Sequence, residues 1–205
     1  ANLVPAVIVG HSLGGAVALQ VALDRPKLVR GLVLIDSAGI GPEINPELLD
    51  RVEAEPSRDE VRKLLELFFE DKKLVLDRGI DEMYRGQTSP GADAALKAVA
   101  AAAFNRDGQL INLRSRLAEV TAPVHLIWGE HDRVLPLHHA WSAASFLPYA
   151  WIDVIDGIGH VPQVEAPAAT VEVIEQFLSA LPPAGAVTSD AASGDADTSS
   201  ESGEA

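Results

Sequence analysis

The feature that most constrains this chain is the pattern Gly10-x-Ser12-x-Gly14, which stands between an apolar run and a helix-forming run. The β-branched residues at 7–9 predict a short buried strand, and residues 15–24 are mostly good helix formers. A serine on such a strand-to-helix turn has a strained backbone and an exposed hydroxyl. Side chains at positions 10 and 14 would collide with this turn or with a neighbouring strand, so both positions favour glycine.

The helix that follows Ser12 directs its N-terminus at the turn, where its free N–H groups favour negative charge. We therefore predict that Ser12 is a nucleophile and that the N–H of Leu13 donates to an oxyanion. A dinucleotide loop would need glycine at position 12, and a Walker-type phosphate loop would need lysine where Ala16 stands. A glycine-rich turn without chemistry remains the plain alternative.

Composition excludes several classes of function. The formal net charge of −14 argues against partners such as nucleic acid or an anionic membrane surface. The chain has no cysteine, which excludes disulfides and thiolate chemistry. It also lacks an apolar run of about 20 residues and a leader-like start. These observations together predict a cytoplasmic protein.

Strands that alternate with helices predict an α/β fold with a parallel sheet flanked by helices. We expect its core in residues 1–36 and 118–181, and an inserted helical cap over residues 37–117, because a parallel crossover needs only about a dozen residues. The tail at 182–205 is acidic and almost free of large apolar residues, so we expect disorder there. We also expect strands at residues 32–35, 124–128 and 151–155. Helices are expected at residues 61–68, 92–104, 110–117, 137–146 and 161–181.

Three chemically matched residues follow predicted strands, namely Ser12, Asp132 and His160. The carboxyl ends of parallel strands meet at one edge of the sheet, so we expect these side chains to lie together. His160 would take the serine proton as base, and Asp132 would orient the imidazole. Asp36 and Glu130 compete with Asp132 for the acid role. As a non-catalytic alternative, Asp132 could form an ion pair with Arg133, and His160 could cap the last helix.

The remaining histidines carry no predicted metal site. His138 and His139 are adjacent, so their side chains diverge by about 100° on a helix. No further cluster in the sequence completes a ligand shell around them. We expect His11, His131, His138 and His139 at the surface or at the rim of a pocket. Apolar residues of the cap, such as Phe68, Phe69, Met83 and Tyr84, are candidates to line that pocket, although most such residues form an ordinary core.

The chain resembles the α/β-hydrolase superfamily from Ala1 to about Leu181. The resemblance implies a Ser–His–Asp acyl-transfer site under a helical cap, with no metal and no organic cofactor. Because the nucleophile is a serine, the chain departs from the dehalogenases and epoxide hydrolases, which use aspartate. The matching segments are Gly10-His11-Ser12-Leu13-Gly14-Gly15, Trp128-Gly129-Glu130-His131-Asp132-Arg133-Val134-Leu135-Pro136 and Gly159-His160-Val161-Pro162-Gln163-Val164-Glu165.

Residues 37–45 and the last of these segments are similar to the hydrolase-like domain of the dihydrolipoamide acetyltransferase of acetoin dehydrogenase complexes. Carbon–carbon bond hydrolases of ring-cleavage products are related in type. We therefore expect a serine hydrolase of a small ester, thioester or carbon–carbon bond. Acyl transfer to a thiol or alcohol, or a non-catalytic module in a larger assembly, are the alternatives.

The chain starts at Ala1, without methionine, almost directly on its first strand, so we expect it to be the C-terminal part of a longer protein. The N-terminal half of the family, with four strands and the loop that gives the second oxyanion donor, is not in this sequence. We therefore expect low activity and low solubility of the chain alone. The expected partners are a small-molecule substrate and either a multi-enzyme complex or a second copy of the chain.

Overall fold

The computed structural model describes residues 5–182, and a four-stranded parallel sheet lies at its centre. The predicted α/β class is confirmed. The predicted disorder of the tail lies outside the described residues, apart from position 182. No helix among residues 5–182 has both the length and the apolar character that a membrane crossing requires. In sheet order the strands are β1 (Ala6–His11), β2 (Val29–Ile35), β5 (Val124–Gly129) and β6 (Ala150–Ile155).

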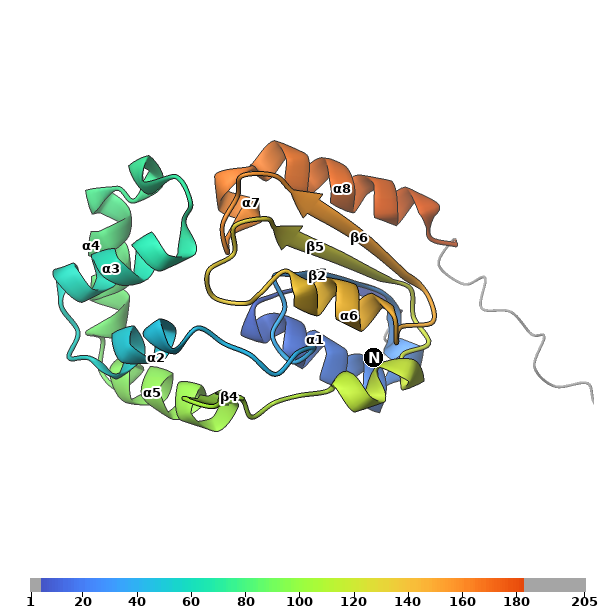
Figure 1. Cartoon of the computed structure of the whole chain (residues 1–205), viewed down its shortest axis with the longest axis horizontal. Coiled ribbons are helices and arrows are strands. Elements are labelled where there is room, and N and C mark those ends of the chain that lie inside the picture. The colour runs from blue at the N-terminus through green and yellow to red at the C-terminus, as the bar shows by residue number, and fades with distance from the viewer. Residues whose placement is uncertain (1–4, 183–205) are drawn as a thin grey trace, which may run out of the picture.

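Helices cover both faces of this sheet, which explains why its central strands are apolar along most of their length (Figure 1). Leu32, Leu34 and Leu126 point to one face and pack in the same cluster as residues of α1 (Leu13–Asp24) and α6 (His138–Ala144). The alternate residues of the same strands point to the other face, where they pack against α8 (Pro167–Ala180). The period of two along each strand therefore separates two apolar layers.

Two of the predicted helices differ from the structure. The predicted closing helix at 161–181 is two helices, α7 (Pro162–Glu165) and α8, because Ala166 lies outside the helical region before Pro167. The predicted helix at 110–117 is a 3-10 helix, η3 (Arg114–Glu119). It is preceded by a hairpin of β3 (Phe104–Asn105) and β4 (Gly108–Gln109), where Gln109 N–H donates to the carbonyl of Pro42 at 2.7 Å.

The chain between β2 and β5 forms four α-helices that lie beyond the carboxyl ends of the strands (Figure 1). Ser57 caps the start of α3, where its Oγ accepts a hydrogen bond from Glu60 N–H at 3.1 Å. The division into a core and a cap with boundaries at 37 and 117 stays a prediction. The helices of this segment are α2 (Pro46–Glu53), α3 (Arg58–Phe68), α4 (Asp77–Gln87) and α5 (Ala92–Ala103), with the short 3-10 helix η2 (Lys72–Leu74) between α3 and α4. Another short 3-10 helix, η1 (Pro26–Leu28), precedes β2.

The last residues of α3 and the turn after it, together residues 66–71, contact the loops at the edge of the sheet. His160 N–H donates to the carbonyl of Phe68 at 2.7 Å. Arg133 donates to the carbonyls of Glu66 and Phe69 at 2.8 and 2.5 Å. These carbonyls stand at the end of α3, where they have no intrahelical donor. Groups from the loops after β5 and β6 therefore complete the C-terminus of the helix.

Glu165 binds the same turn from its other side. Its Oε2 accepts hydrogen bonds from the N–H groups of Glu70 and Asp71, at 2.8 and 3.0 Å. Its Oε1 accepts from Gly159 N–H at 2.8 Å. One carboxylate thus joins the β6–α7 loop to a turn 94 and 95 residues earlier in the chain. Charge-assisted hydrogen bonds of this kind are about twice as strong as neutral ones.

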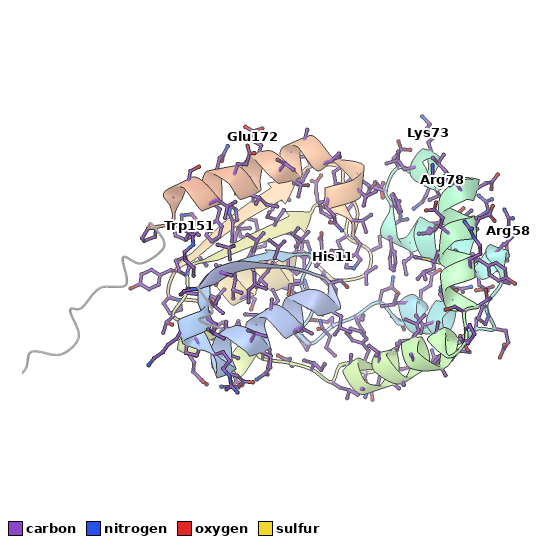
Figure 2. All side chains as sticks on the ribbon, turned by 180° about the vertical axis from the view of Figure 1, so that it is seen from behind. His11, Arg58, Lys73, Arg78, Trp151 and Glu172 are labelled. Carbon is purple, nitrogen blue, oxygen red and sulfur yellow. The ribbon has the colours of Figure 1, made fainter. Side chains whose placement is uncertain are left out.

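We predict that Glu165→Ala lowers the free energy of unfolding by about 2 kcal/mol, because it leaves three backbone N–H groups without an acceptor. Amide hydrogen exchange of Gly159, Glu70 and Asp71 should become faster, and chemical denaturation measures the stability. The matched control is Glu172→Ala on the exposed side of α8 (Figure 2), which should change the stability by less than about 0.5 kcal/mol. Equal effects of the two substitutions would contradict this role of Glu165.

Candidate functional site

The ends of β1, β5 and β6 bring the three predicted residues Ser12, Asp132 and His160 together. Ser12 lies between β1 and α1 at φ 52° and ψ −123°. Its Oγ is 3.0 Å from Nε2 of His160. The Nδ1 of the same imidazole is 2.9 Å from Oδ2 of Asp132. The three side chains therefore form one continuous chain of hydrogen bonds.

Backbone groups hold the carboxylate of Asp132 in this orientation. Its Oδ1 accepts hydrogen bonds from Val134 N–H at 2.7 Å and from Leu135 N–H at 3.0 Å. The side chain is fully buried, and the His160 side chain is 2% exposed. Glu130, a competing candidate for the acid, instead accepts from Gly157 N–H at 2.9 Å. The oxygen of Asp132 that faces His160 is therefore fixed by contacts at the other oxygen.

Asp36, the other candidate for the acid, lies directly beside Asp132. It follows β2 with a left-handed φ of 41°, is fully buried, and accepts a hydrogen bond from Gly129 N–H at 2.9 Å. Burial, and then the neighbouring charge of Asp132, raise the pKa of Asp36 well above its usual value. The carboxylate of Asp132, and not that of Asp36, accepts the hydrogen bond from His160. The sequence alone favoured Asp132 but did not exclude Asp36 as the acid.

The turn at Ser12 presents Leu13 N–H at the start of α1, where it has no intrahelical acceptor. A Cβ at Gly10 would lie 2.5 Å from the carbonyl oxygen of Gly14, so glycine at position 10 permits the sharp turn. A Cβ at Gly14 would meet no atom within 4 Å among the residues that the structure describes. The expectation of a collision at position 14 is therefore wrong for these residues.

His11 contacts His160, which the sequence did not indicate. We expected it at the surface or at a pocket rim, but it is partly buried against His160. Its Nε2–H donates to the carbonyl of His160 at 2.7 Å, and the two ring centroids are 4.9 Å apart. Figure 2 shows it between the sheet and the helices of the β2–β5 segment. Burial is the main cause that lowers the pKa of His11 to about 4, and the neighbouring His160 adds to it.

Phe68 is the apolar candidate that reaches the site. Its ring centroid is 5.4 Å from that of His160, and it is partly buried. Phe69, Met83 and Tyr84 pack in an apolar cluster that also contains Val161 of the β6–α7 loop, and Phe68 packs against the same cluster. Phe68 therefore borders the imidazole on the side of the helices.

Known proteins with similar sequences and structures were compared with this chain. A sequence model described as "Alpha/beta hydrolase family" matches residues 2–173. A dihydrolipoyllysine-residue acetyltransferase component of an acetoin cleaving system from Pseudomonas putida is 34% identical over 180 residues, which are 88% of this chain and 46% of that protein. A 2-hydroxymuconate semialdehyde hydrolase from Pseudomonas sp. strain CF600 is 34% identical, over 84% of this chain and 61% of that protein.

A solved structure agrees with the fold. The meta-cleavage product hydrolase from Pseudomonas fluorescens IP01 aligns with a TM-score of 0.77 and 24% identity, over 86% of this chain and 65% of that one. The chain thus spans about half to two thirds of the length of these proteins.

We predict opposite effects for alanine at the two glycines of the turn. Gly10→Ala should lower the free energy of unfolding by about 1–3 kcal/mol, because its Cβ meets the backbone of Gly14. Gly14→Ala lies in α1 with free space around it and should raise the stability by up to about 1 kcal/mol. Chemical denaturation of both variants measures the difference. Similar losses of stability in both variants would show that the turn is not shaped as described.

We also predict a pH effect that depends on His11. Its pKa is about 4 in the folded state and about 6.5 in the unfolded state, so between these values the unfolded chain binds more protons. The free energy of unfolding should therefore fall as the pH falls through this window, by about 3 kcal/mol from this group. His11→Asn can still donate to the His160 carbonyl but does not titrate. Its stability should fall less than that of the wild type, and parallel profiles would contradict the prediction.

Proposed function

Because the chain belongs to the alpha/beta hydrolase family, we propose that it is a serine hydrolase with Ser12 as nucleophile, His160 as general base and Asp132 as the orienting acid. The observation that carries the proposal is the continuous hydrogen-bond chain from Ser12 Oγ through the imidazole to a buried carboxylate, with distances of 3.0 and 2.9 Å. A serine hydroxyl is a weak nucleophile without such a base.

In the first step, Ser12 Oγ attacks the carbonyl carbon of the substrate, and Nε2 of His160 takes the hydroxyl proton. The carbonyl oxygen becomes an oxyanion, and the hydrogen bond to Asp132 stabilises the imidazolium. When the tetrahedral intermediate collapses, the imidazolium gives its proton to the leaving group. An acyl group then remains on Ser12 as an ester.

The developing oxyanion needs hydrogen-bond donors, and Leu13 N–H at the start of α1 supplies one. A single donor of this type contributes about 2.7–4 kcal/mol to the stability of the transition state. A second backbone donor is usual in α/β-hydrolase sites. Phe68 contacts His160 through its ring and its carbonyl, so we assign residues 66–71 to the wall of the acyl site.

The second step releases the acyl group to water or to another acceptor. Two of the similar proteins are named as hydrolases of 2-hydroxymuconate semialdehyde and of meta-cleavage products, which favours a small carbonyl substrate and water. The similar acetoin-system component favours the second candidate function, transfer to a thiol. Adding a small thiol to the reaction and analysing the products separates these two, since a thioester forms only if the thiol competes with water.

We predict that Ser12→Ala and His160→Ala each lower kcat by on the order of 10⁶, and Asp132→Asn by about 10⁴, in the full-length protein. Hydrolysis of p-nitrophenyl acetate and labelling by a fluorophosphonate probe measure the effect. Ser145→Ala, at an exposed serine of the same protein, is the control and should react as the wild type. Absence of labelling in the wild type, or labelling that survives in His160→Ala, would contradict catalysis and favour a non-catalytic module.

A further inference from the structure

A second group of side chains that can bind a ligand lies in the 37–45 loop and at the start of α6, outside the hydrogen-bond chain of Ser12. We call Glu43, His138 and His139 the Glu43 cluster. Nε2 of His139 is 2.5 Å from Oε2 of Glu43, and Nε2 of His138 is 3.3 Å from Oε1. One potential ligand atom from each residue lies within 4.8 Å of the others. The carboxylate thus stands between two imidazoles.

The divergence of adjacent helical residues does not prevent this arrangement. His138 and His139 begin α6, and their rings meet edge to face with centroids 4.9 Å apart. Each Nε2 is directed at a different oxygen of Glu43. The sequence did not indicate this, because Glu43 is 95 and 96 residues away from them.

The cluster is held in place by its surroundings. The expected surface or rim position is wrong for His139, whose side chain is 1% exposed. Its ring lies against Gly41, where a Cβ would be only 2.2 Å away. The backbone carbonyl of Glu43 accepts from Gln109 Nε2 at 2.8 Å. The Glu43 and His138 side chains are 51% and 61% exposed, so an ion has access from solvent.

We propose that the Glu43 cluster binds a borderline divalent transition-metal ion of the Zn²⁺ class. Two imidazole nitrogens and one carboxylate oxygen are a common set of zinc ligands, which leaves a fourth position for water. The ion would enter between the rings and the carboxylate, and the proton on each Nε2 would move to Nδ1 or to solvent. Ca²⁺ and Mg²⁺ prefer sets of oxygen ligands and should not bind.

The protonation of the cluster suits an ion at neutral pH. Burial lowers the pKa of His139, which favours the neutral imidazole that a metal needs. A hydrogen bond from His139 lowers the pKa of Glu43, which favours its carboxylate form. Nδ1 of His139 has no hydrogen-bond partner among the described residues. We therefore expect an affinity about 10–100-fold below that of a site with a complete outer shell.

The test uses full-length protein without a histidine tag, titrated with Zn²⁺ by calorimetry and with Co²⁺ by visible absorption. We expect one ion per chain and a higher Tm with Zn²⁺. Glu43→Gln and His138→Asn change exposed side chains, and each should weaken Zn²⁺ binding at least about 10-fold. The matched control is His131→Asn, whose ring lies 3.5 Å from Glu130 and 3.6 Å from Glu70 and should leave binding unchanged.

Three results would overturn the proposal. The first is the absence of Zn²⁺ and Co²⁺ binding to the wild type. The second is an equal loss of affinity in the His131→Asn control. The third is binding that survives in both cluster variants, which would place the ion at the other group of suitable ligands, Asp36, Asp132 and His160. None of these readouts depends on catalytic activity.

Discussion

Parallel pairing of β1, β2, β5 and β6 is the constraint on which the rest of the structure depends. It sends the carboxyl ends of the four strands to one edge, and each strand is followed there by a polar group that enters the site. Ser12 follows β1, Asp36 follows β2, and the loops after β5 and β6 carry Asp132 and His160. Local backbone strain at Ser12 and Asp36, both with positive φ, is tolerated because neighbouring strands fix these positions, as when Ser12 N–H donates to the Ile35 carbonyl at 3.0 Å.

Hydrogen bonds join the helices between β2 and β5 to this same edge of the sheet. His160 donates its backbone N–H to Phe68, and Glu165 joins Gly159 to the turn after α3. A displacement of α3 therefore has to change contacts made by the residue whose imidazole faces Ser12.

Residues that follow strands could be predicted because local pattern determines them. The apolar β-branched runs predicted the parallel sheet, which is confirmed. Their ends predicted that Ser12, Asp132 and His160 lie together, and the structure joins these side chains by hydrogen bonds. The chemical roles of the three residues stay predictions. Contacts between distant segments could not be predicted. Glu165 with the turn after α3, and Glu43 with His139, depend on how helices pack in space, which periodicity does not encode.

The most direct test of Ser12 as the nucleophile is a crystal structure of the full-length protein after reaction with a phosphonate ester. If Ser12 is the nucleophile, phosphorus should be covalently bonded to Ser12 Oγ, and a phosphoryl oxygen should lie about 3 Å from Leu13 N–H. The imidazole of His160 should still be hydrogen-bonded to Asp132. An unmodified Ser12, or a phosphonate bound at another residue while Ser12 and His160 keep their positions, would contradict Ser12 as the nucleophile.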